Sequence, residues 1–218
     1  MTHAASSPDT VDGEPLVAVA TAVREFGHLV TSRALQDPRL AAEIVDTLAH
    51  LADRMRTLDA RERDREAELA QMFESPAEDG KPMSAGITCP VTGPGNPLGL
   101  AGSVLRDGAT AVGRFTFRAA SAGLPGVVHG GHVAAAVDGL LGLSVVQLTG
   151  VPVVTAMLEI SYLAPVPLNQ EVVITARLVS RTGRKYVVGA EGRGDDVLLF
   201  RATSLFISPR SSTEPTEA

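Results

Sequence analysis

The sequence predicts an α+β fold in which a five-stranded antiparallel sheet wraps around one long central helix, with an N-terminal helical extension. Three observations support this prediction. The segment 12–74 is almost free of glycine and proline and repeats apolar residues at helical spacing. Residues 130–148 form one long apolar stretch, and five segments around it alternate polar and apolar residues between turn signals. A curved sheet wrapped around the apolar helix buries both.

The N-terminal extension is predicted to contain two helices. The first runs from about Pro15 to Leu35, and Asp37-Pro38 separates it from the second. The apolar residues of the second helix recur at steps of three or four: Leu40, Ile44, Leu48, Leu51, Met55 and Leu58. The polar ends of the chain, 1–11 and 210–218, are expected to be disordered tails.

After the helices the composition changes. Residues 75–96 are rich in proline and glycine, which is typical of a linker loop, and the segment 97–209 holds the predicted sheet domain. The five strands are expected at 111–117, 153–163, 171–180, 185–192 and 197–208. In the strand 153–163, strict alternation places Val154, Ala156 and Leu158 on one face and Thr155 and Met157 on the other.

Composition and charge argue against several classes of protein. A net charge of −6 gives no general attraction to nucleic acid. The single cysteine, Cys89, excludes an internal disulfide and a zinc site built from cysteines. The most apolar stretch carries Asp138 near its middle, which argues against a membrane span, and the N-terminus lacks the features of a secretory signal. We therefore expect a cytoplasmic protein with no metal ion and no cofactor.

The start of the apolar helix carries the sequence His129-Gly130-Gly131. The N–H groups at a helix N-terminus lack partners within the helix, and glycines let another molecule approach them. The Gly131 N–H is therefore a candidate to polarise a carbonyl and stabilise the oxyanion formed from it. Asp138 lies two turns further along the same helix face. A carboxylate among apolar residues is costly unless it has a hydrogen-bonding or charged partner, or serves a function. Asp138 is a candidate general base, or a nucleophile.

With these residues the sequence resembles the hotdog-fold acyl-CoA thioesterases of the phenylacetate-pathway (PaaI-like) and mammalian THEM type. His-Gly-Gly followed by Asp nine positions after the histidine is the first shared motif. Four later segments continue the resemblance: Thr155–Tyr162, Pro165–Leu168, Gly183–Lys185 and Ala202–Phe206. Together they cover about residues 97–208. The resemblance implies a hotdog fold and the hydrolysis of an acyl-CoA, or a related acyl thioester, to a free acid and coenzyme A.

The resemblance also assigns roles to single residues. It implies that Asp138 is the catalytic carboxylate and that the Gly131 N–H polarises the thioester carbonyl. His129 matches the motif histidine in a positional role, and Thr155 matches a threonine that positions the water or the carboxylate. Gly130 and Asn96 are also expected to bind substrate.

A basic cluster supplies a second candidate binding feature. Arg177, Arg181, Arg184 and Lys185 fall within nine residues that contain no acid. Coenzyme A carries a pyrophosphate and a 3′-phosphate, and guanidinium groups suit phosphate oxygens. By the resemblance, the turn containing Arg184 and Lys185 lies near the nucleotide end of the ligand, so both residues are expected to bind substrate.

Two rival functions remain on the same fold. Hotdog hydratases pair an aspartate with a histidine five positions later, and this chain has Leu143 there. The other rival is a non-catalytic acyl-CoA-binding sensor or interaction protein. The segment 12–74 carries 8 Arg against 13 Asp plus Glu, which does not suit a DNA-binding helical module. We expect a homodimer or homotetramer whose sites combine residues of two chains, since a five-stranded sheet leaves open edges. The identity of the acyl group stays open.

Overall fold

The structure, a computed structural model, describes residues 13–58, 63–64, 66–67, 70, 72 and 76–210. The predicted tails, apart from Arg210, lie outside the described residues. The helices are α1 (Gly13–Ser32), α2 (Pro38–Thr57), the short 3-10 helix η1 (Ala119–Ser121) and α4 (Gly130–Thr149). The strands are β1 (Ser103–Asp107), β2 (Thr110–Thr116), β3 (Val154–Tyr162), β4 (Glu171–Thr182), β5 (Lys185–Gly194) and β6 (Val197–Ile207).

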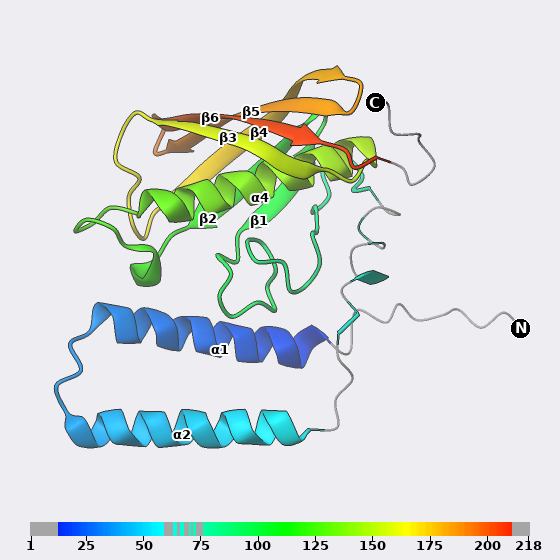
Figure 1. Cartoon of the computed structure of the whole chain (residues 1–218). Coiled ribbons are helices and arrows are strands. Elements are labelled where there is room, and N and C mark those ends of the chain that lie inside the picture. Colours follow the sequence, from blue (N-terminus) through cyan, green and yellow to red (C-terminus); the bar gives the residue numbers. More distant parts are fainter. Residues whose placement is uncertain are drawn as a thin grey trace, which may run out of the picture.

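One antiparallel sheet covers α4. Its strands follow the order β1-β2-β4-β5-β6-β3, so β1 and β3 form the two edges. In Figure 1, the sheet lies above α4, and the hairpin of α1 and α2 lies below. The predicted sheet wrapped around a long helix is confirmed, together with the two N-terminal helices. This is the hotdog arrangement.

The predicted number of five strands is wrong, because the described sheet has six. The additional strand, β1, is only five residues long and buries only Val104, so it carries little apolar alternation. It forms a hairpin with β2 in which Asp107 pairs with Thr110, and Gly108 adopts a φ of 56° in the two-residue turn. A glycine at the first position of a two-residue turn is a hairpin signal and could have revealed this strand.

α4 forms the centre of the hydrophobic core. Its buried apolar residues include Val133, Val137, Leu140 and Leu141, which pack in one cluster with side chains of the sheet. The helix is the one element in the described parts of the chain that is long and apolar enough to cross a membrane. In this structure 56% of the most apolar part of the helix is buried inside the protein.

Two phenylalanine rings lie directly over glycines. A Cβ placed on Gly192 would come within 2.1 Å of the Phe200 ring, and one placed on Gly102 would come within 2.2 Å of the Phe115 ring. Both rings are almost fully buried. The absence of a side chain at these glycines therefore creates the space in which the two rings pack.

The irregular segment 76–102 packs against the side of α4 that faces away from the sheet. The side chain of Val91 occupies the space where a Cβ on Gly139 would lie. Gln147, buried near the end of α4, accepts a hydrogen bond from the Ala77 N–H (2.7 Å) and donates one to the Met72 carbonyl (3.1 Å). These bonds satisfy a buried amide and fix the loop beneath the helix.

α1 packs on this loop and on η1. Ala20 is buried in the contact, and the Arg24 guanidinium donates hydrogen bonds to the carbonyls of Pro94 (3.0 Å) and Asn96 (2.5 Å). Glu25 forms an ion pair with Arg118. His28 Nδ1 accepts a hydrogen bond from the Ala120 N–H (3.2 Å). α1 is thus held on the domain by polar contacts together with the apolar packing of Ala20 and Leu16.

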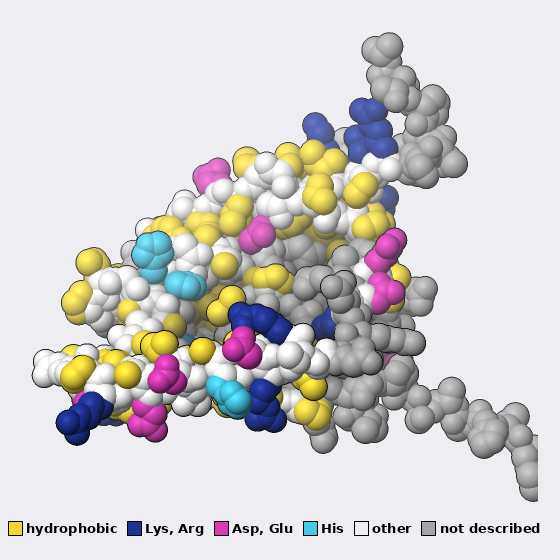
Figure 2. Space-filling model, turned by 60° about the horizontal axis from the view of Figure 1, so that its bottom comes forward, with side chains coloured by type: hydrophobic (Ala, Val, Ile, Leu, Met, Phe, Trp, Pro, Cys, Tyr) yellow, Lys and Arg dark blue, Asp and Glu magenta, His cyan; other side chains and the backbone are white. Residues whose placement is uncertain are grey.

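α2 lies on the outer side of α1. Asp37 caps its N-terminus by accepting hydrogen bonds from the N–H groups of Arg39 and Leu40, and Pro38 occupies its first turn. Its described residues include none that is buried, and large apolar side chains such as Val45 and Met55 remain exposed. Seen from the hairpin side, hydrophobic and charged side chains are interspersed over the surface (Figure 2).

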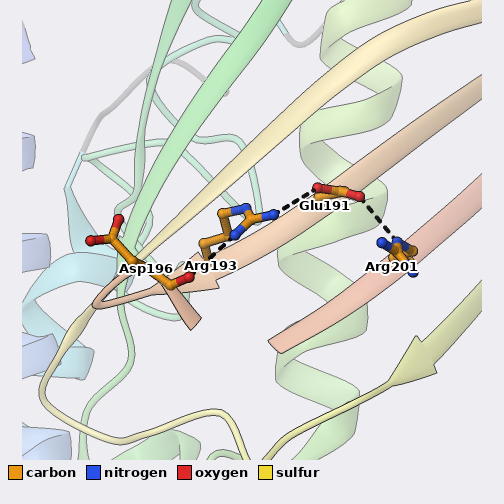
Figure 3. Close-up of polar contacts among 4 residues, drawn as sticks. All are labelled: Glu191, Arg193, Asp196 and Arg201. Atoms are coloured by element: carbon orange, nitrogen blue, oxygen red, sulfur yellow. Dashed lines mark hydrogen bonds and ion pairs between the residues drawn. The ribbon is translucent and has the colours of Figure 1, made fainter. Parts of the chain in front are cut away.

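The outer face of the sheet carries a small polar network (Figure 3). Glu191 on β5 accepts hydrogen bonds from Arg201 Nε (3.0 Å) and from Arg193 (3.4 Å), and Arg193 also donates to the Asp196 carbonyl. The hydrogen bond from Arg201, followed by the one from Arg193, lowers the pKa of Glu191. All three charged side chains are exposed, so the network belongs to the solvated side of the sheet and contributes little to stability.

Candidate active site

The start of α4 is fixed by hydrogen bonds from both sides. The Val128 N–H donates to the Val166 carbonyl (2.9 Å), and the His129 N–H donates to the Ser121 carbonyl (2.8 Å). His129 is the N-cap residue, and its Nδ1 accepts a hydrogen bond from the Gly131 N–H (3.0 Å). The motif histidine therefore satisfies one of the free N–H groups at the helix start.

The neighbouring Gly130 N–H has no acceptor among the described residues. Its carbonyl accepts a hydrogen bond from the Tyr162 hydroxyl at the end of β3 (2.7 Å), and burial raises the pKa of this tyrosine. A Cβ on Gly130 would lie 3.2 Å from the Tyr162 oxygen. Tyr162 was not singled out in the sequence as a site residue, although its position at the end of an alternating strand was visible.

Asp138 has a defined hydrogen-bond partner. Thr155 Oγ1 on β3 donates to Asp138 Oδ1 over 2.8 Å, so the structure brings together two residues that the resemblance associates with catalysis. Asp138 is partly buried, and it lies on the same stripe of α4 as Gly131 and Ala135, both of which are exposed. This stripe is a face of α4 that neither the sheet nor the loop covers.

A β-bulge determines the direction of Thr155. The pairing of β3 with β6 shifts between Thr155 and Met157, so Ala156 is the extra residue. After the bulge, Leu158 and Ile160 face the core, and Thr155 before it also faces α4. The strict alternation predicted for this strand, with Thr155 and Leu158 on opposite faces, is therefore wrong. An extra residue reverses the face of every side chain beyond it.

The basic hairpin lies far from the helix start within one chain. Lys185 pairs with Ile207, and Ile207 pairs with Val154 at the first residue of β3, whereas Gly130 contacts Tyr162 at its last residue. Eight residues of extended chain span about 26 Å. Figure 1 likewise shows the turn between β4 and β5 near the C-terminal end of α4. One chain thus does not place Arg184 and Lys185 beside Gly130.

Two side chains of the hairpin have internal contacts. Arg184 donates a hydrogen bond to the Ser208 carbonyl (2.8 Å), and the Arg181 guanidinium lies 5.0 Å from the centre of the Tyr186 ring. Both contacts leave most of each cation available for a phosphate.

Asn96 is held within the loop. Its side-chain nitrogen donates to the Thr88 carbonyl (3.2 Å), and its side-chain oxygen accepts from the Leu98 N–H (2.9 Å). These bonds shape the turn before Leu98. A role for Asn96 in substrate binding remains a prediction.

The described residues contain no group of three or more His, Cys, Asp or Glu side chains placed to hold a metal ion. The position five residues after Asp138 is Leu143, which is buried, so the side-chain pair of a hotdog hydratase is not present here.

Known proteins match this part of the chain. Residues 125–200, which run from the turn before His129 into β6, match the family model of the Thioesterase superfamily. The match covers about a third of the chain. The resemblance proposed from the motifs is thereby confirmed for the domain that contains α4.

Individual relatives include acyl-coenzyme A thioesterase THEM4. The Bos taurus protein is 41% identical over 87 residues, which is 39% of this chain and 35% of the relative. The Xenopus laevis protein is 38% identical over 87 residues, which is 39% of each chain. The chain therefore spans little more than a third of the length of these curated relatives.

A solved structure extends the similarity beyond the domain. A crystal structure described as a thioesterase superfamily protein superimposes with a TM-score of 0.71 at 25% sequence identity. The superposition covers 93% of this chain and 94% of the other. It therefore includes most of the N-terminal helices, which sequence motifs had matched to no family.

Proposed function

We propose that this protein is an acyl-CoA thioesterase, which hydrolyses an acyl-CoA to a free acid and coenzyme A. One observation carries the proposal: Asp138 receives a hydrogen bond from Thr155 and lies two turns from a glycine-lined helix start, on the same uncovered face of α4. The THEM4 relatives, whose names state this activity, support the same reaction class.

In the proposed reaction, the thioester carbonyl is held by the N–H groups at the start of α4, and Asp138 removes a proton from a water molecule. The water oxygen bonds to the carbonyl carbon, and the negative charge that develops on the carbonyl oxygen is stabilised by the helix N–H groups. The intermediate then collapses and expels the thiolate of coenzyme A. Seven residues separate Gly131 from Asp138, about 10 Å along the helix, which leaves room for a carbonyl and a water.

The contacts of His129 indicate which backbone N–H groups can bind the carbonyl oxygen of the substrate. The Gly131 N–H, predicted for this role, donates to His129 Nδ1 in the free protein. His129 is exposed, so its ring can rotate away at little cost when a substrate carbonyl arrives. The adjacent Gly130 N–H is open within the described chain and supplies a second donor. We propose that His129 occupies the place of the carbonyl oxygen until substrate binds.

The proposal includes a site shared by two chains. β3 is an edge strand with exposed apolar residues, among them Val154 and Met157, and Leu163 directly after it is exposed as well. The neighbouring stripe of α4 is also uncovered. A second copy that pairs along β3 would cover both. It would also bring the second chain's basic hairpin toward the start of the first chain's α4, which the hairpin of the same chain does not reach.

The rival function is an acyl-CoA-binding protein without catalysis. A sensor has no need for a carboxylate fixed by a hydroxyl beside the carbonyl site, whereas hydrolysis requires one.

The test is a hydrolysis screen over short, long, branched, aryl and dicarboxylic acyl-CoAs, with thiol release measured by a thiol-reactive dye. Asp138→Asn keeps the size of the side chain and removes the base, so we expect kcat to fall about a hundredfold or more. Binding of a non-hydrolysable acyl-CoA analogue should persist in this variant. Tight binding without hydrolysis by the wild type would support the sensor, and full activity of Asp138→Asn would refute the mechanism.

A further inference from the structure

A cavity of about 740 Å³ lies between α1 and the thioesterase-superfamily domain. Its walls come from α1, from the loop that follows Asn96, from β2 and η1, and from the first turn of α4. This volume falls within the range of cavities that hold small-molecule ligands. Arg24, Glu25 and His28 line the cavity, so α1 forms one of its walls.

The first indication that the cavity binds a ligand comes from Gly27. It lies in the middle of α1 and lines the cavity, and a Cβ placed on it would meet no atom within 4 Å. Its φ is not among the positive values, so the backbone does not require glycine there. A glycine inside a helix costs about 1 kcal/mol relative to alanine. Neither packing nor backbone geometry requires glycine here, and the missing side chain leaves more room in the cavity.

The charges that line the cavity indicate the chemistry of the ligand. Arg114 pairs with Glu171 (2.7 Å), and Arg118 pairs with Glu25. Arg24, the third arginine in the lining, donates to the neutral carbonyls of Pro94 and Asn96 and has no carboxylate partner among the described residues. The lining thus contains three arginines against two glutamates, and it attracts an anionic group.

The cavity reaches the start of α4. His132, in the first turn of α4, lines it, and the His132 ring lies 6.3 Å from the ring of His129, measured between centres. Ser121 lines it as well, and its carbonyl accepts the His129 N–H. The Nδ1 of His132 is the one buried side-chain polar atom without a hydrogen-bond partner in the described parts of the chain. The cavity therefore begins within one helical turn of the proposed carbonyl site.

We propose that this cavity receives the acyl group of the thioester and that it selects acyl groups with a distal carboxylate, such as the monothioester of a dicarboxylic acid. The inference rests on the proposed thioesterase function. The thioester carbonyl sits at the helix start, the acyl chain passes His132, and the carboxylate reaches the arginines beneath α1. α1 thereby takes part in substrate choice without contributing to the chemistry.

The test compares two substrates that differ only at the far end of the acyl chain, adipoyl-CoA and hexanoyl-CoA. The wild type should show a kcat/KM at least tenfold higher for adipoyl-CoA. Gly27→Leu places a side chain in the cavity, and the open space around residue 27 and the helix propensity of leucine favour a folded variant. This variant should lose at least tenfold in kcat/KM for adipoyl-CoA and change by less than twofold for acetyl-CoA.

Ala22→Leu is the matched control, because residue 22 is an exposed position of the same helix that does not line the cavity. It should hydrolyse all three substrates like the wild type. A preference for hexanoyl-CoA that Gly27→Leu abolishes would overturn the carboxylate specificity. Equal losses for all three substrates, or weaker binding of free coenzyme A, would overturn the assignment of the cavity to the acyl group.

The proposed thioesterase function can be refuted independently of the ligand assigned to the cavity. A wild type that hydrolyses no thioester refutes the thioesterase proposal. In that case calorimetry with adipoyl-CoA reports on the cavity: affinity that is at least tenfold weaker in Gly27→Leu than in Ala22→Leu supports the ligand site, and equal affinity refutes it.

Discussion

Thr155 donates its hydroxyl proton to Asp138 over 2.8 Å, from an edge strand to the central helix. Thr155→Val keeps the shape of the side chain and removes the donor. A hydrogen bond to a charged group contributes about 1.5–3 kcal/mol, so we expect kcat to fall about tenfold or more. Thr155→Ser restores the donor and should recover most of the activity. Equal kinetics for the valine variant and the wild type would assign Thr155 to strand packing alone.

His129→Ala should separate a positional histidine from one that takes part in the chemistry. The substitution removes the cap of α4 and should lower the free energy of unfolding by about 1 kcal/mol. It also releases the Gly131 N–H, so KM should fall or stay unchanged and kcat should stay within about tenfold of the wild type. Thermal unfolding and initial rates measure the two effects. A folded variant that loses more than a hundredfold in kcat would make His129 an acid, a base or an essential donor.

Lys185→Ala and Arg184→Ala should raise KM for acyl-CoA and leave kcat nearly unchanged, because phosphate contacts are the same in the ground and transition states. Added salt should reduce the difference from the wild type, since exposed charge pairs are screened. Arg193→Ala removes an equally exposed charge near the opposite end of β5 and is the control. If the hairpin variants and the control behave alike, the hairpin does not bind the nucleotide.

His28 should make the attachment of α1 depend on pH. Burial, followed by the positive charge of Arg118, lowers the pKa of His28 in the folded protein. Because the unfolded chain then takes up the proton first, the free energy of unfolding falls as the pH drops below about 6.5, toward the folded pKa. Thermal unfolding at pH 7.5 and 5.5 should show a larger loss for the wild type than for His28→Gln. The same loss in both proteins would contradict this prediction.

Met157→Glu should dissociate the oligomer if β3 is the interface. Met157 is 44% exposed in one chain, so a charge there is tolerated in a monomer and buried in the proposed pair. Light scattering should give the mass of one chain for this variant, together with a loss of hydrolysis. Val197→Glu, at an exposed apolar position of β6, should keep the wild-type mass. A wild type that is monomeric and fully active would rule out a shared site.

Local patterns were sufficient to predict α1, α2, α4 and the strands from β2 to β6. α2 and the strands have a clear apolar period, α4 is one long apolar run, and turn signals mark the boundaries. The cap of α2 at Asp37-Pro38 and the turn at Gly183 are local signals of this kind. β1 was not predicted from the sequence, because it buries only one side chain and lies at an edge of the sheet. Its evidence was the Gly108-Ala109 turn, a short-range signal in an otherwise irregular segment.

The contacts of the site were harder to predict. The motif identified Asp138 and Thr155 as partners in function, but the strand period placed Thr155 on the face away from Leu158. The single bulged residue in β3 reverses this assignment of faces, and no local signal in the sequence predicts the bulge. The hydrogen bond between His129 and Gly131 and the cavity beside Gly27 depend on side-chain direction and on the seating of α1, which are tertiary properties.

The rings of Phe115 and Phe200 each occupy the room left by a glycine, Gly102 and Gly192. A larger residue at either glycine therefore requires a compensating substitution at the phenylalanine that packs on it. A larger residue at position 192 is compatible with the core only if position 200 becomes smaller in the same step, so the two positions should show strong epistasis. In a chain with only 4% aromatic residues, a library that varies such positions one at a time would report them as invariant. Paired libraries would reveal the sequences that this core can still accept.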